Sequence, residues 1–341
     1  MSARGSGGPA AGSARETLGA WAELLRVSAL FTVVGDGLAG AAALGARPGR
    51  ATALAVGASL CLYEAGMALN DWADRDEDAV DRPHRPIPSG RISPPAALAA
   101  AGGLTAAGLA LAARAGRPSL AVGTALAATV WSYDLRLKHT PAGPAAMGAA
   151  RSLDLLLGAT ATAHAAGSAR PAAAGKAAAA GKTAVAAKGA ARPAGSGVRA
   201  ALPAAAVLGA HTAAVTTVSR RETQGGSTAL PLAALAVTGA VGALLGRRPP
   251  DTAPGTPGRG ARHALAATLA AVYAGTAGRP LLHAALNPSP DLTQRAVGGG
   301  IRAMIPLQGA LAARGGAAGV ALGVMGLVPL ARTVARKVSP T

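Results

Sequence analysis

Large side chains and cysteines are scarce in this 341-residue sequence. Aromatic residues make up 2% of it, and the single cysteine is Cys61. One cysteine excludes an internal disulfide and a cysteine-based metal site. A soluble domain of this length needs large apolar side chains to fill its core, because interiors are tightly packed and alanine buries little area. The shortage of aromatics therefore argues against an ordinary soluble fold.

Acidic residues are also few. There are 15 of them against 33 lysines and arginines, which gives a formal net charge of +18. A basic surplus is found in proteins that bind nucleic acid. Here, however, the basic residues lie in pairs or small groups between apolar runs, as in the loops of membrane proteins. We therefore expect membrane lipid as the surrounding partner, and no nucleic acid.

Alanine and glycine dominate what is present, and small residues let membrane helices approach closely. A helix needs about 20 mostly apolar residues to cross a bilayer. No sustained period-two alternation is present, and alanine is depleted in strands. The sequence therefore predicts an all-α, polytopic transmembrane bundle of about nine helices, with 296–312 read as a half-helix or interfacial segment. The candidate spans are 19–46, 51–69, 94–113, 118–134, 142–166, 200–218, 228–246, 263–286, 296–312 and 315–333.

Polar and low-complexity segments divide these spans. We expect residues 1–17 to be a disordered tail, and residues 18–166 to form a transmembrane bundle. Residues 167–199 are rich in Ala, Gly, Pro and Lys and predict a basic linker that does not fold alone. Residues 200–341 then form the second part of the bundle.

One acidic motif follows the second span, with the sequence NDWADRDEDAVDRPHRPIPSGRI at 70–92. At about 100° per residue of helix, Asn70, Asp71, Asp74 and Asp78 share one arc of about 100°. Four oxygen-bearing side chains on one face would repel one another without a cation between them. Carboxylate and amide oxygens suit Mg²⁺, which often shares its shell with substrate phosphates.

Arginines follow the carboxylates directly. Arg82 and Arg85 are placed to meet phosphate oxygens, which the planar guanidinium binds well. The alternative is a solvated acidic loop whose charge the arginines balance. The position beside a membrane span and the shared face favour a site for a magnesium-bound diphosphate.

These residues resemble a known family. The pattern NDxxDxxxD, followed by RPIPSGR at 85–91, resembles the first aspartate-rich motif of UbiA-type membrane prenyltransferases, and most closely that of the EboC-like subgroup. The segment 24–36 resembles the family's first helix, in which Arg26 lies near the cavity mouth. The segment 131–140 resembles its Tyr/Lys stretch, here with Tyr133 and Lys138.

The resemblance implies about nine transmembrane helices around a central cavity. It also implies two aspartate-rich loops that hold Mg²⁺ and a prenyl diphosphate, and transfer of the prenyl group to an acceptor. Asp71, Asp74 and Asp78 are then the catalytic metal ligands, with Asn70 beside them. The implied substrate contacts are Asn70, Arg26, Arg82, Arg85, Lys138, Tyr133 and Arg221.

The second aspartate-rich motif is degenerate. It is expected at 211–227, where Val218 and Ser219 stand in place of another aspartate. Glu222 could ligate a second Mg²⁺, while Arg220 and Arg221 could bind diphosphate. The alternative is a basic loop at the membrane edge.

Several polar residues fall inside predicted spans, where charged groups are costly and usually face a cavity. Glu64 lies near the face of the acidic motif. Asp36 and Asp154 lie in other spans, and Arg151 is spaced to pair with Asp154. Structural ion pairing and substrate contact remain equally open for them.

The leading hypothesis is a multi-pass prenyltransferase of the cell membrane that moves an isoprenoid chain from its diphosphate to an unidentified acceptor. The degenerate second motif favours an alternative, a non-catalytic isoprenoid-binding or carrier protein of the same fold. A CDP-alcohol phosphotransferase is a third reading, but residues 70–92 lack the Asp-Gly and Ala-Arg pairs of that family.

Overall fold

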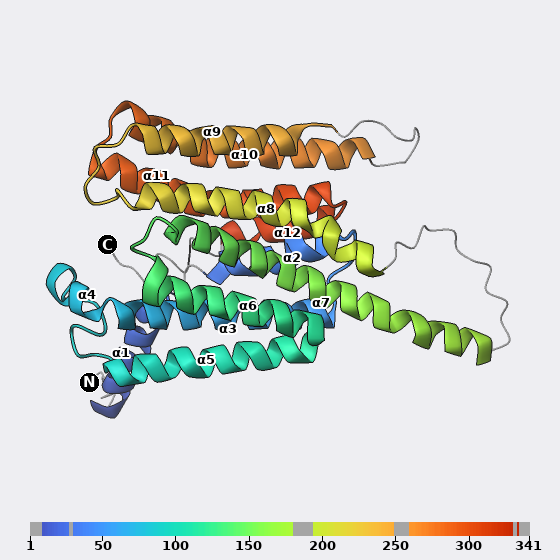
Figure 1. Ribbon diagram of the computed structural model, residues 1–341, viewed down its shortest axis with the longest axis horizontal. Coiled ribbons are helices and arrows are strands. Elements are labelled where there is room, and N and C mark those ends of the chain that lie inside the picture. Colours follow the sequence, from blue (N-terminus) through green and yellow to red (C-terminus); the bar gives the residue numbers. More distant parts are fainter. Residues whose placement is uncertain (1–8, 27–29, 180–193, 249–258, 330–332, 334–341) are drawn as a thin grey trace, which may run out of the picture.

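The structure, a computed structural model, describes residues 9–26, 30–179, 194–248, 259–329 and 333. These residues are helical or irregular, and none of them forms a strand. Most of the helices lie side by side along the long axis of the molecule (Figure 1). The elements are α1 (Pro9–Leu24), α2 (Leu30–Ala43), α3 (Arg50–Ala73), α4 (Arg75–Asp81), α5 (Pro94–Ala115), α6 (Arg117–Ser132), the π-helical turn η2 (Tyr133–Leu137), α7 (Gly143–Ala179), α8 (Ala194–Ser219), α9 (Ala229–Gly246), α10 (Arg259–Leu286), α11 (Pro290–Arg314) and α12 (Ala318–Met325).

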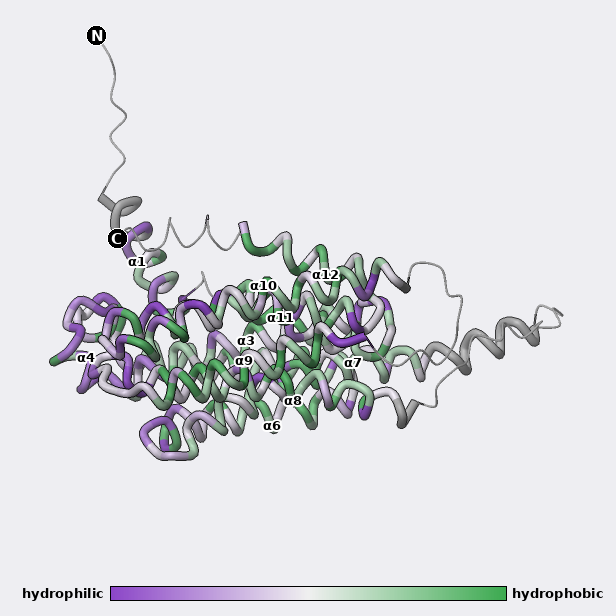
Figure 2. Tube along the Cα trace, turned by 90° about the horizontal axis from the view of Figure 1, so that it is seen from above, coloured by the Kyte–Doolittle hydropathy of each residue, from purple (hydrophilic) through white to green (hydrophobic). Residues whose placement is uncertain are grey.

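Four helical stretches are long and apolar enough to cross a membrane: α3, α5, residues Gly197–Ser219 of α8, and α9. Figure 2 shows the middle of the bundle as mostly hydrophobic, with polar residues gathered at the end that carries α4. The predicted all-α bundle is confirmed by this arrangement.

Small residues allow the helices to pack closely. Helix α2 lies against α7. A Cβ atom at Gly40 would collide with the carbonyl of Leu155, and one at Gly158 would collide with the backbone of Gly37. The two backbones are therefore nearly in contact, which larger side chains would prevent. This close packing explains why the sequence is rich in glycine and alanine.

Two of the predicted spans are wrong in detail. The span at 19–46 is two helices, and the chain turns after α1 at Arg26, whose φ of 50° is left-handed. The segment 296–312 is no half-helix but part of the 25-residue α11, and residues 303–313 of it are all buried. Gly299, Gly300 and Gly309 face neighbouring helices, and Gln308 hydrogen-bonds Asp36 of α2, while Arg302 is exposed. Of 315–333, α12 covers Ala318–Met325, residues 327–329 are helical as well, and residues 330–332 lie outside the described residues.

Helices extend into both the predicted tail and the predicted linker. Helix α1 begins at Pro9, α7 extends to Ala179 and α8 begins at Ala194. Alanine has the highest helix propensity, so alanine-rich sequence continues a helix that packing has already started. Residues 1–8 and 180–193 lie outside the described residues.

We expect Gly40→Val to destabilise the protein by about 1–3 kcal/mol, because the added side chain pushes α2 and α7 apart. The measurement is the thermal unfolding midpoint in detergent. Gly102→Val is the matched control, since nothing lies within 4 Å of a Cβ at this helical glycine. Equal shifts for both variants would contradict close packing at Gly40.

Candidate active site

The acidic motif is not one continuous helix. Helix α3 ends at Ala73, and Asp74 has φ −92° and ψ 5° before α4 begins at Arg75. This break changes the direction of the side chains that follow it. Asp71 and Asp78 are buried, at 4% and 3% exposure, and Asp76 is exposed.

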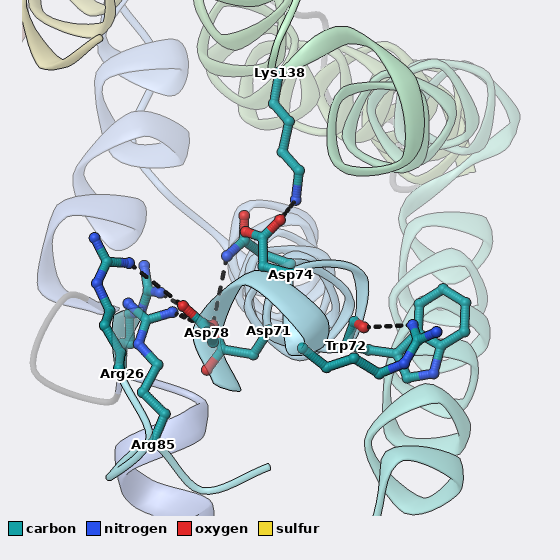
Figure 3. A network of polar contacts seen from close by, with 10 residues as sticks. Arg26, Asp71, Trp72, Asp74, Asp78, Arg85 and Lys138 are labelled. Carbon is teal, nitrogen blue, oxygen red and sulfur yellow. Dashed lines mark hydrogen bonds and ion pairs between the residues drawn. The ribbon is translucent and has the colours of Figure 1, made fainter. Parts of the chain in front are cut away.

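Asp71 and Asp78 converge on one cation. The Nη1 atom of Arg85 lies 3.4 Å from Oδ1 of Asp71 and 2.7 Å from Oδ2 of Asp78 (Figure 3). Arg26 donates to Asp71 at 3.1 Å, and Arg82 lies 3.6 Å from Asp78. Two carboxylates that reach the same nitrogen atom are close enough to share a metal ion instead. The oxygen donors present therefore fit Mg²⁺.

Asp74 points elsewhere. Its Oδ1 atom accepts from Nζ of Lys138, which comes from above in Figure 3, apart from Arg26 and Arg85 at the left. The expectation that four side chains meet on one face is therefore met by Asn70, Asp71 and Asp78 alone. The Nδ2 atom of Asn70 lies 3.4 Å from Asp71. The cause is the break in the helix at Asp74, which a single-helix projection ignores.

A second group of possible metal ligands lies outside this cluster. Among the described residues, ligand atoms of Asp74, Glu77 and His139 lie within 4.8 Å of one another, but Glu77 and His139 are exposed. Exposed acidic groups gather without a metal in many proteins, so this grouping alone indicates no site.

A cavity of about 480 Å³ opens beside the motif, between α3, α6, α7, α8 and α11. Polar side chains lie at its mouth, and its wall is mostly apolar. The mouth includes Arg26, Asn70, Tyr133, Asp134 and Ser219; the wall includes Leu62, Met67, Leu126, Val130, Met147, Val215, Val297 and Met304. An apolar chamber with a few convergent polar groups is the usual form of a small-molecule site.

Polar groups also lie deep in this cavity, on Ser59, Arg151 and Asp154. The expected pairing of Arg151 with Asp154 is wrong. Arg151 pairs with Asp36 at 2.5 Å, and the Ser59 hydroxyl donates to Asp154. Gln308 of α11 adds a hydrogen bond of 2.6 Å to Asp36. The ion pair thus links α2, α7 and α11, a structural role that sequence spacing could not reveal.

Glu64 is buried on α3, outside the residues that line the cavity. Neither of its carboxylate oxygens has a hydrogen-bond partner within the described structure. The expectation that it lines the cavity is therefore not met.

The second motif lies at the same end of the bundle. The guanidinium of Arg220 donates to the carbonyl of Thr140, which joins the turn after α8 to the turn before α7. Arg221 is exposed and lies 3.4 Å from Gln224. Burial raises the pKa of Glu222 above its ordinary value, and the nearby Arg82 opposes this rise.

Asp134 was missed by the sequence reasoning, although it lies between two selected residues. It is 5% exposed, and it lines the cavity on the π-helical turn η2. A π turn is rare and often marks a functional site. Sequence alone gave no signal for the turn.

Residues 28–245 match the model of the UbiA prenyltransferase family, which is more than half of the chain. The chain belongs to this family. It is therefore a multi-pass integral membrane protein, as the sequence predicted, and the expected family is confirmed. Membership of the EboC-like subgroup stays a prediction.

Curated relatives match over shorter stretches. The chain is 41% identical over 115 residues to digeranylgeranylglyceryl phosphate synthase of Methanopyrus kandleri, which is 34% of this chain and 41% of that protein. It is 47% identical over 88 residues to protoheme IX farnesyltransferase of Acidiphilium cryptum, or 24% of this chain and 27% of that one. The chain thus spans less than half the length of either protein.

A solved structure covers far more of the chain. The apo structure of a UbiA homologue from Aeropyrum pernix superposes with a TM-score of 0.56, over 82% of this chain and 96% of that one. The two share 18% sequence identity, so the similarity concerns the fold alone.

We expect Arg85→Gln to lower stability by about 2 kcal/mol or more in EDTA, because two buried carboxylates lose their shared cation. Added Mg²⁺ should recover part of this loss by taking the place of the guanidinium. The measurement is the thermal unfolding midpoint with and without Mg²⁺.

The control is Arg47→Gln, an exposed arginine with no ion pair among the described residues. If Mg²⁺ raises the unfolding midpoint of Arg85→Gln no more than that of this control, metal binding by Asp71 and Asp78 is contradicted.

Proposed function

We propose that this chain is an enzyme that transfers an isoprenoid chain from a prenyl diphosphate to an acceptor within the membrane. One observation carries the proposal: Asp71 and Asp78 converge on a single cation beside the mouth of a mostly apolar cavity. Such a site holds the charged and the hydrocarbon ends of one molecule. We further place the chain in the EboC-like subgroup and in the cell membrane.

The acidic motif would hold the diphosphate end. Asn70, Asp71 and Asp78 would supply oxygen ligands for Mg²⁺, and Asp74 would join them once it releases Lys138. When bound, the ion neutralises diphosphate charge and so stabilises the leaving group. The cations that now pair with these carboxylates are then free to bind phosphate oxygens. They are Arg26, Arg82, Arg85 and Lys138.

The cavity would protect the reaction. The bond between C1 and oxygen breaks with its electron pair on the diphosphate, and an acceptor nucleophile then bonds to C1 and releases its proton. The apolar wall excludes water that would otherwise capture the allylic cation. Tyr133, at the cavity mouth, would lie beside the reacting end, while Arg221 would turn from Gln224 at the surface toward the diphosphate.

The second motif favours one other candidate function. Val218 is buried in the hydrophobic core, and the Ser219 hydroxyl donates to the carbonyl of Thr216. Neither offers a carboxylate. A carrier that binds the isoprenoid without cleaving it would fit a site weakened in this way.

We expect the purified protein to bind geranylgeranyl diphosphate in Mg²⁺ and to lose this binding in EDTA. Asp71→Asn should weaken it about 10-fold or more, because even outer-shell partners of a metal contribute 10–100-fold. Asp76→Asn is the control, with a side chain 88% exposed on the same segment. Equal weakening by both variants, or binding that ignores Mg²⁺, would overturn the diphosphate site.

Turnover separates the enzyme from the carrier. For the enzyme, labelled geranylgeranyl diphosphate with Mg²⁺ and a membrane lipid extract should release inorganic diphosphate. For the carrier, binding persists without release, and Ser219→Asp should restore release by adding the carboxylate that the second motif lacks. The measurement is diphosphate formed over time by both proteins, with Asp71→Asn as the blank.

A further inference from the structure

Asp134 has no partner of its own, although it is more than nine-tenths buried. Within the described residues, no hydrogen bond or ion pair reaches its carboxylate, while Lys138, four residues on, pairs with Asp74. A buried carboxylate without a partner costs several kcal/mol, on the order of the desolvation of an ion. A cation that arrives with a ligand would remove this cost.

The side chain lies one helical turn below the acidic motif. The Oδ2 atom of Asp134 is 3.9 Å from where a Cβ of Gly66 would stand, and Gly66 precedes Asn70 by one turn of α3. That turn corresponds to about 6 Å along the helix axis. Asp134 therefore faces the part of the cavity directly inside the mouth.

The charged groups around Asp134 belong to the first aspartate-rich motif or pair with it. The groups that act on it electrostatically are Lys138, Asp74, Arg26 and Asp71. Glu222, by contrast, is influenced by Arg82 alone. Of the two carboxylates, Asp134 is thus the one placed beside the predicted metal ligands.

The π-helical turn η2 sets this position. The amide of Lys138 donates to the carbonyl of Tyr133, a hydrogen bond that spans five residues. This wide turn places Tyr133 and Asp134 against the cavity at the end of α6. Lys138, at the end of the same turn, pairs with Asp74 instead.

From these observations we propose that Asp134 is a metal ligand, which replaces the aspartate missing from the second motif at 218–219. It would contribute an anionic oxygen to a divalent cation held together with the diphosphate. The inference rests on the proposed function, because this cation would be held only when a diphosphate is bound. It identifies η2, rather than the turn after α8, as the second source of carboxylate.

The test counts metal ions rather than turnover. The full-length protein in detergent is saturated with geranylgeranyl thiodiphosphate, an analogue that resists ionisation, and titrated with Mn²⁺. Electron paramagnetic resonance of free Mn²⁺ gives the number of ions bound per chain. Asp134→Asn, which keeps the side-chain shape, should bind one ion fewer than the wild type. Adding Ser219→Asp to it should restore the lost ion.

Asp76→Asn is the matched control and should keep the wild-type count. An unchanged count in Asp134→Asn, or a loss in Glu222→Gln alone, would overturn the assignment while leaving the diphosphate site intact. If the wild type binds neither analogue nor Mn²⁺, the proposed function fails as well. An unfolding midpoint of Asp134→Asn in EDTA equal to or above that of the wild type would show that any lost ion is not a folding defect.

Discussion

Two carboxylates buried side by side must be neutralised, and the end of the bundle that carries α4 is arranged around this requirement. Asp71 and Asp78 belong to different helices, and both reach one nitrogen atom of Arg85. Arg26, at the turn between α1 and α2, completes the neutralisation of Asp71. Because each carboxylate depends on a cation from another segment, α1, α3, α4 and the loop after α4 are held in one arrangement.

The small residues of the bundle make that arrangement possible. Close approach of α2 and α7 at Gly40 and Gly158 brings their buried ion pair, Asp36 and Arg151, within contact. Charged groups inside a membrane bundle are stable when they face one another rather than lipid. Because the side chains of the bundle are small, an open chamber also remains between α3, α6, α7, α8 and α11.

The sequence predicted the broad architecture because length and hydropathy determine whether a helix can cross a bilayer. It also predicted the acidic motif, because Asn70, Asp71 and Asp78 are spaced along a helical face. It failed where long-range contacts decide the structure. No breaker residue marks the turn at Asp74, and its partner Lys138 lies 64 residues away.

Two further misses have the same cause. Helix α11 is polar and rich in glycine, and its burial depends on helices that hydropathy averages do not consider. Asp134 depends on a π-helical turn, whose backbone hydrogen bond spans five residues instead of four, and composition does not reveal such a turn. Local pattern thus indicates which residues carry chemistry, while packing decides which of them meet.

The cavity has polar groups at both ends, and this limits what can fill it. Ser59, beside Asp154, precedes Asn70 by eleven residues on α3, or about 16 Å of helix. A hydrocarbon chain fits only between these two depths, because contact with Ser59 and Asp154 would separate these polar groups from their hydrogen-bonding partners. If the chamber binds a hydrocarbon chain as proposed, a chain longer than the apolar interval would have to fold back or leave through the wall toward lipid.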